Sequence, residues 1–156
     1  MSGTGAPVAE HLSAEGLRVA IVASRWYPEL TDAMTDSAIT TCADAGALSE
    51  VFRVPGAFEL PVVCAAVAPD YDAVVAIGLV VRGGTPHFDY VCRAATDGLT
   101  RVALDTRTPV GFGLLTCDSM EQAHDRVGLP HSTEDKGREA TLAALETALL
   151  LRGLRS

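Results

Sequence analysis

Four short strand-like runs recur along the chain between longer amphipathic segments. The runs cover residues 17–24, 49–54, 73–81 and 110–116. The run at 17–24 is apolar and β-branched, which is typical of a strand that is buried on both faces, and the run at 73–81 is the strongest strand pattern in the chain. We therefore predict four strands. The glycines in the last run indicate that another backbone approaches it closely.

Apolar positions three or four residues apart mark the intervening segments, and this spacing predicts helices. The first helix is expected to stop at Gly46, the second to hold Pro61 in its first turn, and the third to begin at Thr85-Pro86. The expected helices cover residues 30–46, 61–68, 86–102, 119–128 and 135–154.

Strands that alternate with helices of this length form right-handed βαβ units, so the sequence predicts an α/β fold. The expected architecture is a three-layer αβα sandwich around a central four-stranded parallel sheet. Residues 1–16 are interpreted as an N-terminal arm, and residues 17–156 as a single domain.

Composition and charge mainly exclude classes of protein and kinds of binding site. The 156 residues contain 12 Lys and Arg against 20 Asp and Glu, and this net charge of −8 leaves no basic surface for nucleic acid. No apolar run is long enough to cross a membrane, and the N-terminus lacks a secretory signal, so a cytoplasmic protein is expected. The four widely spaced cysteines fit no metal or disulfide motif and are expected to be buried free thiols.

Unusual residues directly follow the strands. Parallel α/β sheets bind ligands outside the carboxyl ends of their strands. The stretches there are RWYP (25–28), PGAFE (55–59), RGGTPH (82–87) and CDS (117–119). They contain the only Trp, a Glu beside a glycine turn, and a Gly-Gly-Thr-Pro-His turn. This edge of the sheet is therefore the expected site.

The turn at residues 82–87 has the features of an anion site. Thr85 is a good N-cap and Pro86 a good first helical residue, so the turn ends at a helix N-terminus. Gly83 and Gly84 leave backbone N–H groups uncovered beside the positive end of the helix dipole. The alternative is a glycine-rich connection that binds nothing. No P-loop or dinucleotide-binding pattern is present.

His87 follows in the first turn of that helix. The helix dipole disfavours an imidazolium there, so a neutral ring that accepts a proton near pH 7 is expected, although a bound phosphate would act in the opposite direction. Trp26 belongs either to the core or to a platform that stacks on a planar heterocycle. Glu59 either caps the next helix or accepts hydrogen bonds from a polyol, helped by the N–H groups of Ala57 and Phe58.

Three further residues look misplaced for a site at this edge. Phe112 lies inside the last strand, and its position alone predicts a core residue. Arg126 closes a helix, where the dipole alone explains a cation. Lys136 opens the final helix, which is an unfavourable end for a cation and indicates an anionic partner.

Several blocks of the sequence together resemble the 6,7-dimethyl-8-ribityllumazine synthase family. They are VPGAFELP (54–61), AIGLVVRGGTPHFDYV (76–91), PVGFGLLT (109–116), EQAHDRVG (121–128) and DKGREA (135–140). The blocks follow the family's order, and G-x-T-x-H-[FY]-D is highly specific. The resemblance implies a flavodoxin-like fold and a transferase of riboflavin biosynthesis that uses no metal or redox cofactor.

The family condenses 5-amino-6-(D-ribitylamino)uracil with 3,4-dihydroxy-2-butanone 4-phosphate. A Schiff base forms, phosphate leaves, and the ring closes with loss of water. The resemblance implies that Trp26 stacks on the pyrimidine and that His87 shuttles protons. The other implied contacts are Ala57, Phe58 and Glu59 at the ribityl chain, Leu79, Val80 and Val81 at the ring, and Gly84, Thr85 and Arg126 at the phosphate.

The resemblance also implies that identical subunits share the sites, with Phe112, Arg126 and Lys136 supplied by a neighbour. Family members form pentameric rings, and in some of them twelve rings close into a hollow shell. The link at residues 128–136 is two residues longer than in shell formers and contains Pro130. We expect a homopentamer, alone or paired as a decamer, without shells. Residues 7–12 are expected to add an edge strand to a neighbour's sheet.

Other functions remain open at this point. Tyr27 stands where many family members have Asn after the stacking aromatic, which bears on pyrimidine recognition. The alternatives are a homologous riboflavin synthase and a non-catalytic flavin- or lumazine-binding protein, although His87 and Arg126 favour catalysis. A receiver-type signalling domain is a further alternative, but it lacks its acidic cluster here.

Overall fold

The computed structural model describes residues 4–7 and 11–155, which contain four strands joined by helices. The strands are β1 (Arg18–Ser24), β2 (Leu48–Val54), β3 (Ala73–Val81) and β4 (Val110–Cys117). They are all parallel, in the order β2-β1-β3-β4. This order is that of flavodoxin-like doubly wound sheets, so the predicted fold class is confirmed.

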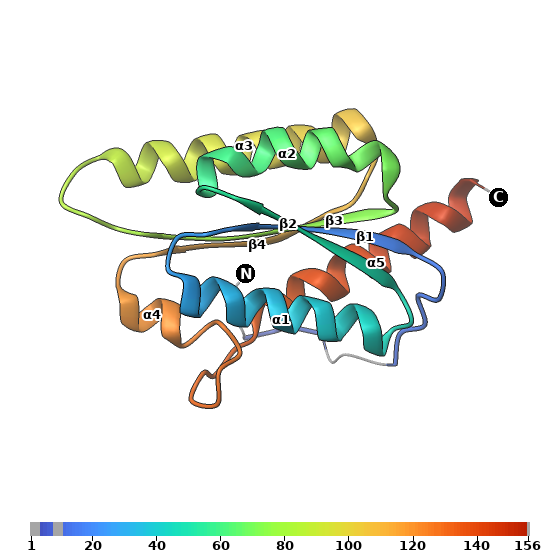
Figure 1. The fold of residues 1–156 in the computed structure, drawn as a ribbon, viewed down its shortest axis with the longest axis horizontal. Coiled ribbons are helices and arrows are strands. Elements are labelled where there is room, and N and C mark those ends of the chain that lie inside the picture. Colours follow the sequence, from blue (N-terminus) through green and yellow to red (C-terminus); the bar gives the residue numbers. More distant parts are fainter. Residues whose placement is uncertain (1–3, 8–10, 156) are drawn as a thin grey trace.

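Helices cover both faces of the sheet and give the three predicted layers (Figure 1). The helices are α1 (Pro28–Asp44), α2 (Leu60–Val67), α3 (His87–Thr106), α4 (Met120–His124) and α5 (Lys136–Arg155), with the short 3₁₀ turns η1 (Ala57–Glu59) and η2 (Ala68–Asp70) beside α2. On one face lie α2 and α3, and on the other lie α1, α4 and α5 (Figure 1). No helix of the described residues is both long and apolar enough to cross a membrane.

Each face of the sheet has its own apolar core, because successive strand residues point to opposite faces. Ile21 of β1 belongs to the core with Met34 of α1, whereas its neighbour Val22 belongs to the core with Leu60 of α2. All four side chains are almost fully buried, and burial of each stabilises the fold by roughly 1.5–3 kcal/mol. Burial on both faces explains why β1 and β3 appear as continuous apolar runs.

A close approach of β4 and α5 was expected from the glycines of the last strand. A Cβ at Gly111 would collide with the carbonyl oxygen of Ala140 in α5. Glycine therefore lets the helix pack directly on the strand, and the expectation is confirmed.

The helix predicted for residues 119–128 is wrong at its C-terminal end, because α4 stops at His124. Beyond it the backbone leaves the helix and pairs with the chain that leads into α5. Val127 and Asp135 form an antiparallel bridge, and the N–H of Lys136 donates to the carbonyl of Arg126 at 3.0 Å. This long-range pairing replaces the last helical turn.

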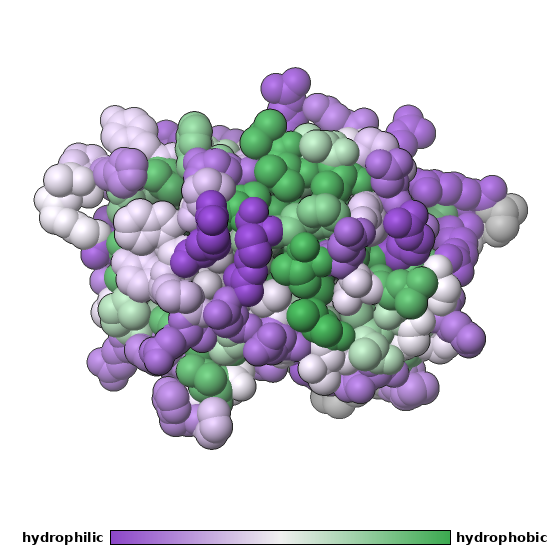
Figure 2. Space-filling model, in the orientation of Figure 1, coloured by the Kyte–Doolittle hydropathy of each residue, from purple (hydrophilic) through white to green (hydrophobic). Residues whose placement is uncertain are grey.

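The two edges of the sheet are β2 and β4. Figure 2 shows hydrophobic surface gathered near the middle of the face that carries the β2 edge, over α2 and β2. Leu48 of β2 and Val62 of α2 are exposed. The arm strand expected at residues 7–12 includes residues 8–10, which lie outside the described residues.

Candidate active site

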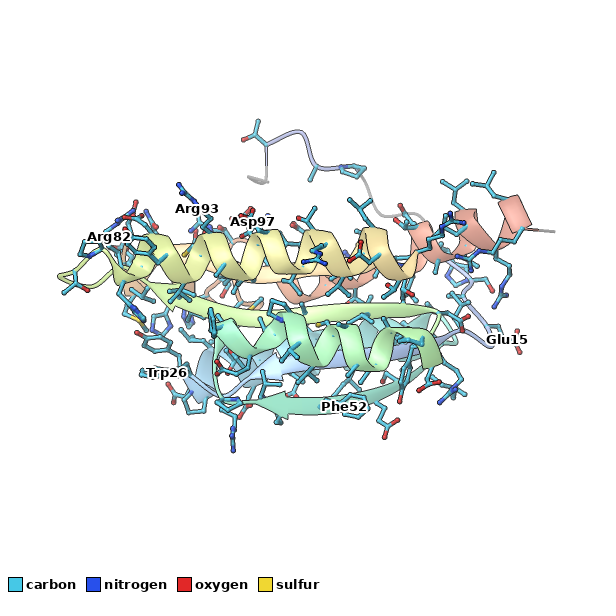
Figure 3. The ribbon with its side chains drawn as sticks, turned by 90° about the horizontal axis from the view of Figure 1, so that it is seen from above. Glu15, Trp26, Phe52, Arg82, Arg93 and Asp97 are labelled. Atoms are coloured by element: carbon cyan, nitrogen blue, oxygen red, sulfur yellow. The ribbon has the colours of Figure 1, made fainter. Side chains whose placement is uncertain are left out.

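A cavity of about 740 Å³ opens at the carboxyl ends of β1 and β3. The chain passes from β1 to β2 on one side and returns to β3 on the other side of β1, so these two strands mark the topological switch point. Doubly wound sheets bind ligands in the crevice at this point. Figure 3 shows Trp26 and Arg82 at this end of the molecule and Glu15 at the opposite end.

Eight of the predicted site residues line this cavity together. They are Trp26, Ala57, Phe58, Glu59, Leu79, Val80, Val81 and His87. They come from the connections after β1 and β2, from the end of β3 and from the start of α3. The remaining five predicted residues do not line the cavity of this chain: Gly84, Thr85, Phe112, Arg126 and Lys136.

Other lining residues were not among the predicted site residues: Tyr27, Gly56, Tyr90, Val91 and Ala94. On α3, the positions 87, 90, 91 and 94 have the i, i+3, i+4, i+7 spacing of one helix face. The sequence therefore contained a signal for this stripe. It was hidden because the stripe shares Val91 with the neighbouring core stripe.

Trp26 is not a core residue, since its side chain is 64% exposed. Its backbone is nevertheless held firmly. The N–H of Arg25 donates to the carbonyl of Val54 at 3.0 Å, and the hydroxyl of Thr31 donates to the carbonyl of Trp26 at 3.2 Å. The indole therefore projects from a fixed backbone into the mouth of the cavity.

Tyr27 adopts the left-handed backbone conformation, with φ 54° and ψ 64°. This conformation costs a side-chain-bearing residue about 1–2 kcal/mol, and Asn tolerates it better than Tyr. The Tyr27 ring is half-buried against the core and lies 6.2 Å from the ring of Trp26. Tyr27, where the family resemblance leads one to expect Asn, is therefore a strained residue directly beside Trp26.

Glu59 does not cap α2. It occupies the N-cap position of the helix, but its side chain makes no capping hydrogen bond. The half-buried carboxylate instead lines the cavity beside Gly56 and Ala57. This geometry favours the ligand-binding interpretation of Glu59 over the capping one.

Arg82 anchors the start of the Gly-Gly-Thr-Pro turn. Its Nε lies 2.8 Å from Asp118 Oδ1, its Nη1 lies 3.5 Å from Asp89 Oδ1, and its guanidinium stacks 4.3 Å above the ring of Phe88. The N–H of Arg82 also donates to the carbonyl of Cys117 at 2.9 Å. The turn is thus tied to both β4 and α3.

The rest of this turn is open to solvent. A Cβ at Gly84 would meet nothing within 4 Å, and in the described part of the chain no hydrogen bond takes up the N–H of Gly84 or Thr85. The predicted N-cap is displaced by one residue, because α3 begins at His87 with Pro86 in the capping position. Thr85 still accepts a long hydrogen bond of 3.4 Å from the N–H of His87.

Phe112 is 51% exposed, so the expectation that its position alone makes it a core residue is wrong. The reason is that β4 is an edge strand and α3 does not cover its outer part. The ring lies in a shallow apolar hollow with Leu104 and Val110. This surface is separate from the cavity lined by Trp26.

The anionic partner expected for Lys136 lies within the chain. Its Nζ is 2.7 Å from Glu139 Oε2 and 3.1 Å from Glu134 Oε1. Burial lowers the pKa of Lys136, but hydrogen bonds and charge from Glu139 and Glu134 outweigh it, so the net shift is upward. Arg126 reaches the same cluster, with Nε 3.5 Å from Glu134 Oε2.

The cysteines are free thiols, as predicted, and three of them are buried. Burial raises the pKa of Cys42 to about 11 and that of Cys64 to about 12, so both stay protonated and unreactive near neutral pH. Among residues 4–7 and 11–155, no three His, Cys, Asp or Glu side chains gather as a metal site.

The fold and the cavity define a flavodoxin-like α/β protein with a small-molecule site at its switch point. The chain belongs to the 6,7-dimethyl-8-ribityllumazine synthase family, whose sequence model matches residues 16–152. It is 61% identical over 156 residues to the 6,7-dimethyl-8-ribityllumazine synthase of Frankia casuarinae, with 99% of this chain and 98% of that one covered. Proteins of the same name from Renibacterium salmoninarum (58% identical, 97% and 100% covered) and Saccharopolyspora erythraea (57%, 99% and 94%) are also similar.

Proposed function

We propose that the cavity beneath Trp26 is where this chain condenses 5-amino-6-(D-ribitylamino)uracil with 3,4-dihydroxy-2-butanone 4-phosphate. Family membership makes the chain a transferase of riboflavin biosynthesis that forms 6,7-dimethyl-8-ribityllumazine and releases phosphate and water. The observation that supports this site is the convergence of eight expected residues on one cavity at the switch point. Neither a homologous riboflavin synthase nor a carrier protein is favoured.

The cavity offers a surface for each part of the pyrimidine substrate. The exposed indole of Trp26 stacks on the planar ring, opposite the apolar wall of Leu79, Val80 and Val81. The carboxylate of Glu59 accepts hydrogen bonds from the ribityl hydroxyls, beside Ala57 and Phe58.

The open turn before α3 receives the second substrate. The unoccupied N–H groups of Gly84 and Thr85 donate to the phosphate at the positive end of α3. His87 lies between this turn and the cavity, where it transfers protons as the Schiff base forms and phosphate leaves. Holding the amine against the ketone contributes roughly 7–11 kcal/mol, and proton transfer adds about two to four powers of ten in rate. The chemistry needs no metal or redox cofactor.

A neighbouring subunit completes the site by supplying Phe112 and Lys136 to the pyrimidine side and Arg126 to the phosphate. Two observations support this proposal: all three lie outside the cavity of their own chain, and Phe112 is exposed. The assembly is a homopentamer, alone or paired as a decamer. The link of residues 128–136 projects from the body of the subunit (Figure 1). We expect it to hinder the docking of further rings.

The remaining assignments are also proposals. Residues 1–16 form an N-terminal arm in which residues 7–12 add an edge strand to a neighbour's sheet, and residues 17–156 form the single enzymatic domain. The enzyme works in the cytoplasm on two small molecules, without nucleic acid or membrane.

The function is tested by mixing the two substrates with the protein and following lumazine fluorescence and phosphate release. We expect one lumazine and one phosphate per turnover. Arg126→Ala should raise the KM for the butanone phosphate and leave the KM for the pyrimidine unchanged. Riboflavin made from lumazine alone would indicate the homologous riboflavin synthase, and binding without product would indicate a carrier.

A further inference from the structure

Three charged side chains share one face of the connection between α4 and α5. The chain pairs antiparallel there, through the bridge of Val127 with Asp135 and the hydrogen bond from Lys136 to Arg126. Residues opposite each other in an antiparallel pair point to the same face, and so do residues two apart along one strand. Arg126, Lys136 and Glu134 therefore project together.

The carboxylate of Glu134 bridges the two cations. Its Oε1 lies 3.1 Å from Lys136 Nζ, and its Oε2 lies 3.5 Å from Arg126 Nε. The side chains of Glu134 and Lys136 are each only 14% exposed, so solvent and salt screen this pair less than an exposed one. Glu139 holds Lys136 from a second direction. The position of the Glu134 carboxylate is thus well defined.

Arg126 has a second anchor. Its Nη1 donates to the carbonyl of Gln122 at 2.7 Å. Within the described residues no partner is found for Nη2, and a third of the side chain is exposed. The guanidinium is therefore held at Nε by Glu134 and at Nη1 by Gln122, while its Nη2 offers hydrogen-bond donors to a ligand.

We propose that Glu134 is a positioning residue for Arg126: its carboxylate, held by Lys136, fixes the guanidinium in the orientation that binds the phosphate of the butanone substrate. This inference rests on the proposed role of Arg126. A donor that is already ordered loses less conformational entropy when the ligand binds. Lys136 then contributes to the phosphate site through Glu134, in addition to any contact of its own.

Glu134→Gln tests this role because it keeps the shape of the side chain and removes its charge. We expect the KM for the butanone phosphate to rise about five-fold, with kcat and the KM for the pyrimidine unchanged. The matched control is Glu121→Gln, which removes the same charge from α4. In the described chain Glu121 makes no ion pair, so its substitution should leave both KM values unchanged.

A double-mutant cycle separates positioning from a general structural effect. If Glu134 acts through Arg126, Glu134→Gln should have no further effect on the KM in an Arg126→Ala background. A structural role predicts instead that the two effects add, and that both KM values change with the midpoint of unfolding. Glu134→Asp keeps the charge but shortens its reach, so it should raise the same KM less. It provides the test if Glu134→Gln does not fold.

A wild-type or lowered KM in Glu134→Gln, or an additive effect with Arg126→Ala, would overturn the inference. The two proposals fail in different ways. If the unaltered protein makes no lumazine, the proposed function is wrong. If it makes lumazine and only Arg126→Ala raises the KM for the butanone phosphate, the positioning role of Glu134 alone is wrong.

Discussion

The indole of Trp26 lies directly against Gly56. A Cβ at Gly56 would stand 3.1 Å from Cδ1 and 3.2 Å from Nε1 of the ring. The φ of Gly56 is −152°, an extended value that any residue adopts, so glycine is needed for space and not for backbone conformation. The ring is exposed and has room to move. A methyl group at position 56 should therefore shift the ring without unfolding the protein.

Gly56→Ala is expected to raise the KM for the pyrimidine about five-fold, because it tilts the stacking platform. The KM for the butanone phosphate should not change.

The chain has one Trp, so the emission of Trp26 reports ligand binding directly. Riboflavin or the pyrimidine should quench it, with a weaker apparent affinity in Gly56→Ala. Emission that saturating ligand leaves unchanged would remove Trp26 from the site.

His87→Ala should slow turnover by about two to four powers of ten and still leave measurable activity, because positioning survives the loss of the proton shuttle. The matched control is His131→Ala, at an exposed histidine in the link before α5. That variant should turn over at the wild-type rate. Complete loss of activity in His87→Ala, or no loss, would contradict the assigned role.

The stability of the protein is expected to depend on pH through the contact between Asp125 and Thr133, in the connection between α4 and α5. The pKa of Asp125 is lowered because the hydroxyl and the N–H of Thr133 donate to its carboxylate at 2.8 and 3.1 Å. A carboxyl whose pKa falls on folding stabilises the fold above its unfolded pKa, and the contribution is lost as the pH falls through the folded value. Asp125→Asn should therefore destabilise the protein at pH 7.

The difference in unfolding free energy between the wild type and Asp125→Asn should disappear as the pH falls below about 4. Urea unfolding of the wild type and Asp125→Asn at several pH values between neutral and acidic measures it. Thr133→Val removes the stronger donor and should reproduce part of the loss at neutral pH. If the unfolding free energies of the wild type and Asp125→Asn differ by the same amount at all pH values, the charge of Asp125 does not contribute to stability.

Strands β1 and β3 were predictable from the sequence because their burial on both faces leaves a local signal, whereas β2 is an edge strand in which only Val54 is buried. The run at 73–81 matches β3, and the run at 49–54 differs from β2 by one residue. The end of α4 could not be predicted in this way. It depends on the pairing of Val127 with Asp135, a contact between segments that local periodicity does not connect.

The residues that line the cavity could be predicted where they follow strands, and could not where three-dimensional packing decides. Trp26 and His87 are predictable from their place at the carboxyl edge of the sheet. Position alone predicts a core residue at Phe112, because an apolar residue in a strand does not reveal that the strand lies at the edge of the sheet. Glu134 gave no signal, since its bridging role requires the folded connection.

The proposed assembly predicts a particle of five times the chain mass of 16.3 kDa, or twice that for a paired ring. Sedimentation velocity or light scattering measures this mass. Deletion of two residues from the link at 128–136 should remove the obstacle to ring packing. A megadalton hollow particle formed by the unaltered protein would contradict the proposal.

In the proposed assembly, each site needs Trp26 from one subunit and Arg126 from its neighbour. Subunits of Trp26→Ala and Arg126→Ala, each of which has impaired sites when assembled alone, are mixed in equal amounts. In rings of mixed subunits about one site in four regains both residues. Lumazine formation by the mixture should then be well above the mean of the two pure variants. Activity equal to that mean would contradict a shared site.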